Sequence, residues 1–149
     1  MAGEGPGRVL SVLRAWLLIV ALMAFGNTIQ TFRNHSFLST HLYTGSPNMV
    51  NGLHARAYGV WTMLSSIVRL ACAIDITNKS LYLVCLSTFV LALGHFLSEA
   101  FVYNTALLTV GLAAPLIVAG SSLVAMLIGL LYLNKGGEVV SRERRKKAF

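Results

Sequence analysis

The chain has 149 residues, of which 56% are hydrophobic and 11% are charged, and its formal net charge is +7. An ordinary soluble domain is about one-quarter charged and needs more polar surface than this chain offers to cover a single core. The composition therefore excludes a typical soluble enzyme domain, and it predicts that much of the apolar surface faces lipid.

Four apolar stretches are long enough to cross the hydrocarbon core of a bilayer, which takes about 20 residues. They cover about 11–29, 55–76, 81–101 and 112–133. The second stretch is the weakest because Arg69 interrupts it. The sequence predicts an all-α fold: a polytopic membrane protein built as a four-transmembrane-helix bundle in one membrane domain.

The first stretch has two interpretations. Arg8 and Arg14, an apolar run and then Ala24-Phe25-Gly26 resemble a secretory signal with a small-residue cleavage site. The apolar run continues to Ile29, which favours an uncleaved signal anchor. Both interpretations leave the later three spans in the same orientation.

The connections between the spans differ in length. Residues 30–54 form the only sizeable polar loop, with turn signals at 45–48 and at 51–52. Residues 75–80 form a short link, which predicts a tight hairpin of the second and third spans.

The last apolar region must contain a break. No charge occurs from Ala100 to Asn134, and one helix of that length would be about 50 Å long, too long for a single span. The polar residues 103–105 are suited to a turn, and Pro115 is suited to the first turn of the next helix.

The distribution of positive charge predicts the orientation. Six of the twelve Lys and Arg residues lie from Lys135 onward, in the basic tail 134–149, and positive charge near span ends favours the cytosol. Four spans place both termini in the cytosol and the loop 30–54 in the lumen. The tail suits anionic membrane lipid. It has no interleaved aromatic residues and no nucleic-acid motif, so no nucleic-acid partner is expected.

Lys146 and Lys147 stand fourth and third from the end of the chain. This arrangement resembles the dilysine retrieval signal of endoplasmic-reticulum membrane proteins, which is read on a cytosolic tail. The alternative is that the two lysines only bind lipid headgroups.

Ionisable residues inside a span are costly and are functional candidates by default. Glu99 and Arg56 lie at matching depths near the lumenal end, about 27 and 30 Å along their helices. We expect an Arg56–Glu99 pair with His95 one turn away, and we expect Arg69 to snorkel towards cytosolic headgroups. His95 and Glu99 are compatible with a proton relay or with a polar clasp between helices. The apolar midplane favours the clasp.

Small residues recur at every fourth position of the last span, at Ser121, Ala125 and Gly129. Such a stripe allows close helix packing in lipid. It packs either inside the bundle, which is favoured, or against a partner.

Recognisable catalytic machinery does not occur in the sequence. The four histidines are not spaced as di-iron histidine boxes, and there is no GxGxxG motif, P-loop or nucleophile elbow. Cys72 and Cys85 lack metal-ligand spacing. We therefore expect no enzyme activity, no cofactor and no metal site. The broken-helix pairs and midplane polar sites of a transporter are also missing.

Five blocks of sequence carry a resemblance to one known family, and they occur in the family's order. They are Arg14-Ala15-Trp16-Leu17; Phe25-Gly26-Asn27-Thr28-Ile29-Gln30; Leu42-Tyr43-Thr44-Gly45; Ala55-Arg56 with Gly59-Val60-Trp61-Thr62 and Leu64-Ser65-Ser66; and Leu93-Gly94-His95-Phe96-Leu97-Ser98-Glu99. Together they resemble the ergosterol biosynthetic protein 28 family in the version typical of animals. The resemblance covers about Val9 to Leu133, which is most of the chain.

The resemblance implies a function that the composition alone does not. It implies a small non-catalytic anchor of the endoplasmic-reticulum membrane that tethers the enzymes of sterol C4-demethylation. The implied partners are a sterol C4-methyl oxidase, a decarboxylating 3-hydroxysteroid dehydrogenase and a 3-keto-steroid reductase. Such a scaffold would act by effective concentration. A small lipid or ion transporter is the alternative, and self-association into a homo-oligomer stays open.

The same blocks supply candidates for partner contacts. We expect the loop 30–54 and the lumenal halves of the second and third spans to form one contact surface. The interaction candidates are Trp16, Asn27, Gln30, Tyr43, Gly45 and Trp61 from these blocks, together with Arg69.

Overall fold

The computed structural model describes residues 5–147, which form helices and connecting loops without any strand. Four helices are long and apolar enough to cross a membrane, which confirms the predicted multi-pass membrane fold. The elements are α1 (Gly5–Arg33), α2 (Ser36–His41), the 3-10 helix η1 (Pro47–Met49), α3 (Gly52–Ile74), α4 (Lys79–Phe101) and α5 (Val110–Lys147).

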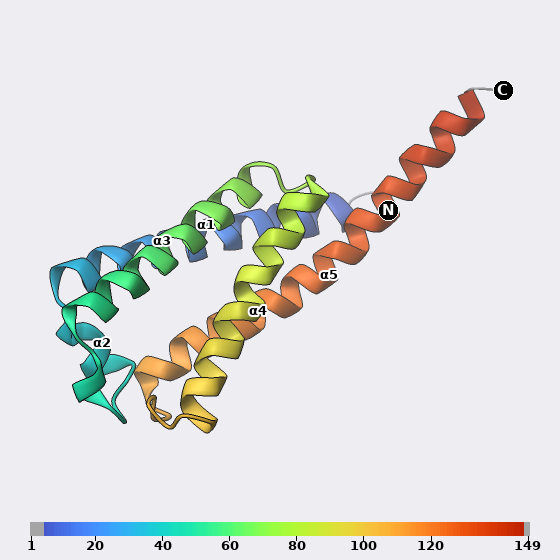
Figure 1. The fold of residues 1–149 in the computed structure, drawn as a ribbon. Helices are drawn as coiled ribbons and strands as arrows, with labels where there is room; N and C mark the ends of the chain where they lie inside the picture. The colour runs from blue at the N-terminus through green and yellow to red at the C-terminus, as the bar shows by residue number, and fades with distance from the viewer. Residues whose placement is uncertain (1–4, 148–149) are drawn as a thin grey trace.

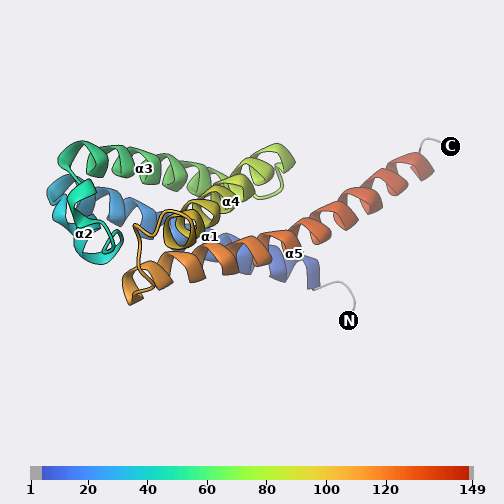
Figure 2. The same ribbon diagram turned by 60° about the horizontal axis from the view of Figure 1, so that its bottom comes forward.

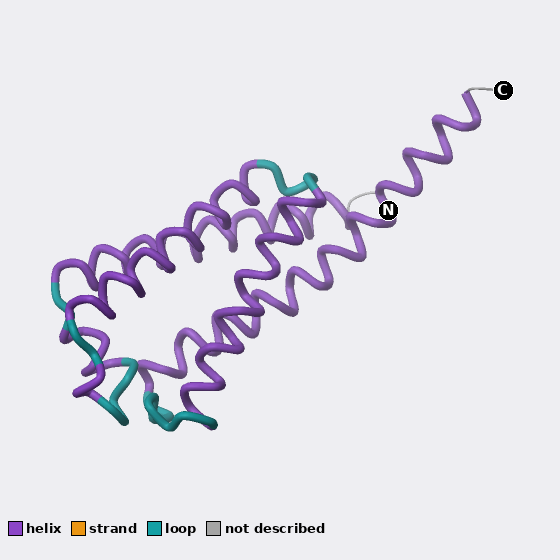
Figure 3. The backbone as a smooth tube through the Cα atoms, in the orientation of Figure 1, coloured by secondary structure: helices purple, strands orange, loops and turns teal. Residues whose placement is uncertain are grey.

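The four long helices alternate in direction along the chain. The start of α1, the α3–α4 link and the end of α5 therefore lie towards one end of the bundle, and α2, η1 and the α4–α5 loop lie towards the other (Figures 1 and 3). α1 packs mainly against α3, and α4 packs mainly against α5 (Figure 1). The bundle is thus two helix pairs, which contact each other directly at the end where the chain starts and are bridged by α2 at the other end.

Polar caps explain where the middle helices begin. The Asn51 side chain accepts a hydrogen bond from the backbone N–H of His54 at 2.9 Å, and that of Asn78 accepts one from Leu81 at 3.1 Å. Each bond satisfies one of the N–H groups that a helix start leaves unpaired. After α4 the chain turns through Asn104, whose φ of 54° is left-handed. This turn confirms the predicted break at residues 103–105.

α5 is longer than a single span requires. Its 38 residues extend over about 57 Å, and its last turns project beyond the other helices (Figure 2). The basic tail is therefore helical as far as Lys147, and Lys146 and Lys147 are exposed in its last turn. The two residues after Lys147 lie outside the described part. Pro115 lies in the second turn of α5, not in the first as predicted, because the helix begins at Val110.

The α1–α3 interface is close because its side chains are small or carry hydroxyl groups. Gly59 allows α3 to approach α1 so closely that a Cβ at this position would lie 2.6 Å from the Phe32 ring. The Thr28 hydroxyl lies 2.9 Å from that of Thr62 and donates to the Gly59 carbonyl at 3.2 Å. The Ser66 hydroxyl donates to the Ala21 carbonyl at 2.8 Å. Small residues and interhelical hydrogen bonds are what hold helices together in lipid.

The buried side chains form two clusters, one towards each end of the bundle. The first joins α1, α3, α4 and α5 near the α3–α4 link, and the second joins α2 and its neighbouring loops to α3, α4 and α5. Between them the helix pairs separate and leave a cavity. The first cluster is Leu13, Leu17, Val20, Cys72, Ala73, Ile76, Tyr82, Cys85, Phe89 and Met126; the second is Leu38, Leu42, Tyr43, Ala55, Tyr58, Phe96, Ala106 and Leu112.

Candidate functional site

A chain of polar contacts closes the end of the bundle near α2. The Tyr43 hydroxyl lies 2.8 Å from Nε2 of His95, and Nδ1 of His95 lies 3.9 Å from Oε1 of Glu99. The other carboxylate oxygen, Oε2 of Glu99, accepts a hydrogen bond from the Thr105 hydroxyl. These contacts connect the loop after α2, helix α4 and the α4–α5 loop. Their geometry is that of a clasp between segments.

Burial keeps the tyrosine of this clasp neutral. The Tyr43 side chain is 4% exposed. Burial, and to a smaller extent the neighbouring Tyr58 and Glu99, raises the pKa of Tyr43 well above its usual range. A protonated hydroxyl can donate to Nε2 of His95, which leaves the imidazole proton on Nδ1, the atom that faces Glu99.

The predicted Arg56–Glu99 pair does not form. Glu99 turns to Thr105 and His95, whereas Arg56 is exposed on α3 and its guanidinium lies back along its own helix beside Gly52. The pair was expected from the matching distances of the two residues along their helices. Such distances carry no information on the direction in which each side chain leaves its helix, and this direction keeps the two charges apart.

The expectation that Arg69 snorkels to headgroups is also wrong. Arg69 is 8% exposed, its Cζ lies 4.2 Å from the centre of the Phe89 ring, and its Nε donates to the Thr88 hydroxyl at 3.3 Å. The side chain therefore points across to α4 inside the bundle. A cation over an aromatic face is a favourable contact, and this contact replaces part of the lost hydration.

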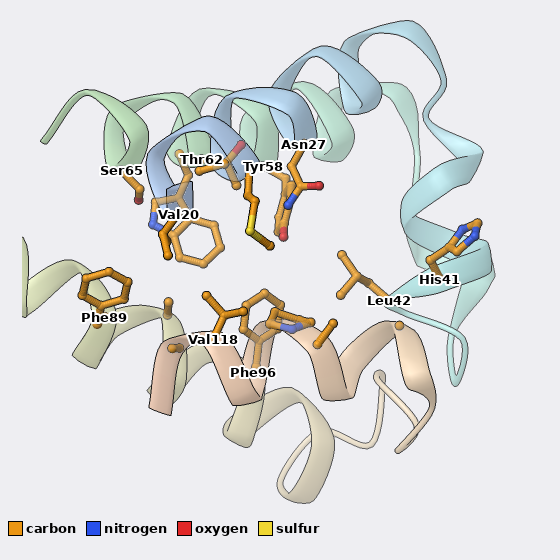
Figure 4. Close-up of a pocket in the computed structure, with 18 of the residues that line it drawn as sticks. Val20, Asn27, His41, Leu42, Tyr58, Thr62, Ser65, Phe89, Phe96 and Val118 are labelled. Carbon is orange, nitrogen blue, oxygen red and sulfur yellow. The ribbon is translucent and has the colours of Figure 1, made fainter. Parts of the chain in front are cut away.

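A cavity of about 290 Å³ lies between the two helix pairs. Figure 4 shows Tyr58, Thr62 and Ser65 on one side of it, facing Phe89 and Phe96 of α4 across the space. The polar wall comes from α3, and the opposite wall from α4 and α5 is aromatic and aliphatic. Lining residues besides those five are Val20, Met23, Ala24, Asn27, Phe37, His41, Leu42, Trp61, Arg69, Ala92, Gly111, Ala114, Pro115, Val118 and Ala119.

The cavity opens sideways, between α1 and α5. The lining residues on this side, Met23, Asn27, His41 and Ala114, are exposed, whereas those of the opposite walls are mostly buried. At one end of the opening the Trp16 indole N–H donates to the Ser122 hydroxyl at 2.8 Å. At the other end α2 meets α5, where a Cβ on Gly111 would collide with the carbonyl oxygen of His41. In a membrane this window faces lipid.

The other interaction candidates from the sequence lie in different parts of the structure. Trp61 packs against His95, with their ring centres 5.3 Å apart, and so joins the clasp. The backbone N–H of Gly45 donates to the Thr105 carbonyl at 3.0 Å and ties the η1 loop to the α4–α5 loop. Gln30 is exposed on α1. The structure thus gathers Tyr43, Gly45, Trp61, His95 and Glu99 at one end, and it places Asn27 and Arg69 along the cavity.

Sequence reasoning missed the polar wall of the cavity. Tyr58, Thr62 and Ser65 precede Arg69 at intervals of three and four residues, which is the spacing of one helix face. This periodicity was visible in the sequence, and it gives α3 a polar face beside the midplane that was described as apolar.

The described residues 5–147 contain no group of three or more His, Cys, Asp or Glu side chains arranged to hold a metal ion. Cys72 and Cys85 are free thiols, both buried in the first core cluster.

Comparison with known proteins gives the family. The family model described as "Erg28 like protein" matches residues 13–124. The human ergosterol biosynthetic protein 28 homolog is 58% identical over 139 residues, which are 93% of this chain and 98% of the relative. The chain belongs to the Erg28-like family.

More distant relatives extend the match to fungi. The ergosterol biosynthetic protein 28 of Schizosaccharomyces pombe is 41% identical over 76% of this chain and 82% of its own length. That of Saccharomyces cerevisiae is 32% identical over 76% of this chain and 77% of its own length. All three relatives are named for ergosterol biosynthesis. No solved structure matches the chain.

Proposed function

We propose that this protein is a non-catalytic scaffold of the endoplasmic-reticulum membrane that tethers the enzymes of sterol C4-demethylation, with both termini in the cytosol. The observation that carries the proposal is the match to relatives named for ergosterol biosynthesis over nearly the whole chain. The partners would be the C4-methyl oxidase, the decarboxylating 3-hydroxysteroid dehydrogenase and the 3-keto-steroid reductase.

The way the structure uses its polar groups supports a structural role. The Trp16–Ser122 bond joins α1 to α5, and the Ser66–Ala21 bond joins α1 to α3. A further bond, from the Tyr82 hydroxyl to the Met126 carbonyl at 2.5 Å, joins α4 to α5. Each bond holds one helix to another, so these groups build a rigid bundle. A rigid bundle with a large lipid-facing surface suits a protein that assembles other membrane proteins.

The test is purification of the tagged protein from membranes in mild detergent, with identification of the proteins that accompany it. We expect the three C4-demethylation enzymes to co-purify and C4-methylated sterol intermediates to accumulate when the protein is removed. A protein that purifies alone, and whose removal leaves the sterol profile unchanged, would overturn the proposal.

We expect such partners to contact the exposed residues at the α2 end of the bundle. Tyr43 and Glu99 are engaged in the clasp, so their replacement would disturb folding and contact together. Arg56 and Gln30 are exposed at the same end of the bundle, on α3 and α1. We expect Arg56→Ala with Gln30→Ala to lower enzyme recovery several-fold while the protein stays folded. Leu64→Ala, at an exposed apolar position of α3, is the matched control and should not change recovery.

One observation favours a second candidate function, a small lipid or ion transporter of the same membrane: the cavity that opens to the bilayer between α1 and α5. Liposomes that contain only this protein distinguish the two. A transporter would move a solute or a labelled lipid between the leaflets faster than protein-free liposomes do. The scaffold would leave the rate unchanged.

A further inference from the structure

Arg69 is a buried cation that lacks an anionic partner among the described residues 5–147. Its side chain is 8% exposed, and no Asp or Glu oxygen of residues 5–147 lies within 4.0 Å of it. Its one side-chain hydrogen bond in this part of the chain runs from Nε to Thr88. A guanidinium has five N–H donors and stays charged. Burying such a charge is costly unless an anion and further hydrogen bonds offset the loss of hydration.

Ser65 provides a second donor beside this cation. It lies one helical turn before Arg69 on the same face of α3 and is 6% exposed. Within residues 5–147 its hydroxyl has no hydrogen-bond partner, and both side chains line the cavity. Neighbouring hydroxyls differ, because that of Thr62 bonds to Thr28 of α1 and that of Ser66 donates to the Ala21 carbonyl of α1. The cavity wall therefore offers two unused donor groups at one place.

The rest of the cavity is suited to an apolar body. From Arg69 to Tyr58 the α3 wall extends over about 16 Å. Opposite it lie the rings of Phe89 and Phe96 with Ala92 between them. A volume of about 290 Å³ is at the lower end of the range for ligand pockets, and the window between α1 and α5 allows a longer ligand to extend into the bilayer.

We propose that this cavity binds a membrane lipid that carries a single carboxylate. The two carboxylate oxygens would accept hydrogen bonds from the Arg69 guanidinium and the Ser65 hydroxyl, and the apolar body would lie along Phe89 and Phe96. A planar carboxylate suits the fork of a guanidinium. The bulky headgroup of a phosphodiester does not suit this end, because Phe89 and the buried core cluster around Val20 and Cys72 enclose it.

This site goes beyond the proposed scaffold role and does not depend on it, because the proposal concerns only the protein and a lipid. The full chain would be purified into nanodiscs of phosphatidylcholine. Three labelled probes would then be titrated: oleic acid, a carboxylic acid with a steroid ring system, and phosphatidic acid. The methyl esters of the two acids are the uncharged controls.

We expect saturable binding of at least one of the two carboxylic acids and at least about tenfold weaker binding of its methyl ester, since a hydrogen bond to a charged group contributes about one order of magnitude or more in affinity. Arg69→Met should weaken acid binding at least about tenfold, and Ser65→Ala should weaken it by a smaller factor. Arg56→Met removes an exposed arginine from the same helix and should leave binding unchanged.

Thermal unfolding separates a binding defect from a folding defect. The acid should raise the unfolding temperature of the wild type and not that of Arg69→Met, while Arg69→Lys should recover part of the shift because it restores the charge. The proposal is overturned if the wild type binds neither acid saturably, if the ester binds as well as the acid, or if folded Arg69→Met binds normally. Saturable binding of phosphatidic acid alone would also overturn it and would assign the site to a phospholipid headgroup.

Discussion

α1 packs against two neighbours in different ways. Towards α3 it is interlocked along most of its length, with Gly59, Thr28 and Ser66 bringing the two backbones together. Towards α5 it makes one close crossing, where a Cβ on Gly129 would lie 2.7 Å from Leu13, and the two helices then diverge around the cavity (Figure 1).

The two contacts of α1 have different consequences: the one with α3 stabilises the bundle, and the one with α5 leaves space for a ligand. In lipid the association of helices depends on close packing and hydrogen bonds, because the lipid chains are as apolar as the side chains. A helix pair with continuous contact is therefore rigid. A pair that touches at only one crossing can diverge and leave a space, and here that space adjoins the one buried arginine of the described chain. The α1–α3 pair serves as the support, and the α1–α5 pair frames the opening.

The largest expected effect belongs to the interlocked pair. Gly59→Leu would place new atoms where Phe32 and Thr31 already lie, at 2.6 and 2.7 Å from the first added carbon. We expect a loss of about 3 kcal/mol in the free energy of unfolding, at the upper end for overpacking. Denaturation in mixed micelles, followed by tryptophan fluorescence, measures this loss.

Gly94→Leu is the matched control, because nothing lies within 4 Å of a Cβ at this position of α4. It should change the free energy of unfolding by less than about 0.5 kcal/mol. Equal losses for the two variants would show that the α1–α3 pair is no tighter than an open helix face.

An intermediate effect is expected at the single crossing of α1 and α5. Trp16→Phe removes the indole N–H that donates to the buried hydroxyl of Ser122. We expect a loss of about 1 kcal/mol, because the remaining hydroxyl stays buried without this donor. A double-mutant cycle with Ser122→Ala should give a coupling of about 0.6 kcal/mol, the usual value for hydrogen bonds between membrane helices. The exposed neighbour Ser121 supplies the control, since Trp16→Phe with Ser121→Ala should show no coupling.

The sequence predicted the fold well because hydrophobic length is a local signal. Each of the four expected spans overlaps a helix of the structure, and the turn after Phe101 occurs where polar residues interrupt the apolar run. The prediction that Ser121, Ala125 and Gly129 pack inside the bundle is correct only at one end of this stripe. Gly129 is buried against Tyr82, whereas Ser121 is exposed. The buried positions of α5 are spaced by three and four residues, and a strict interval of four drifts off that face.

The site was harder to predict for two reasons. The contacts of its side chains depend on how each helix is rotated about its own axis, and one partner residue lies in a loop. Glu99 was expected to pair with Arg56, yet its partner is Thr105, six residues later in a loop that no periodicity describes. Arg69 was expected at the membrane surface because charge usually escapes to water. Its burial follows from the contact of α3 with α4, and it could not be read from α3 alone.

The smallest effect is expected at the clasp, which lies at the end of the bundle where α2 bridges the two helix pairs. Tyr43→Phe removes the hydroxyl that contacts His95 and should cost about 0.6 kcal/mol near pH 8. The pKa of Tyr43 is raised in the folded protein, so its contribution to stability is complete below the unfolded pKa of about 10 and declines as the pH rises above that value. The gap of about 0.6 kcal/mol should therefore vanish slightly above pH 10, and by pH 11 the variant should be the more stable protein by about 0.8 kcal/mol, because only the wild-type denatured state ionises at this position. Unfolding measured at pH 8, 10 and 11 checks this, and a gap that stays constant would mean that Tyr43 is solvated and that the clasp does not close this end.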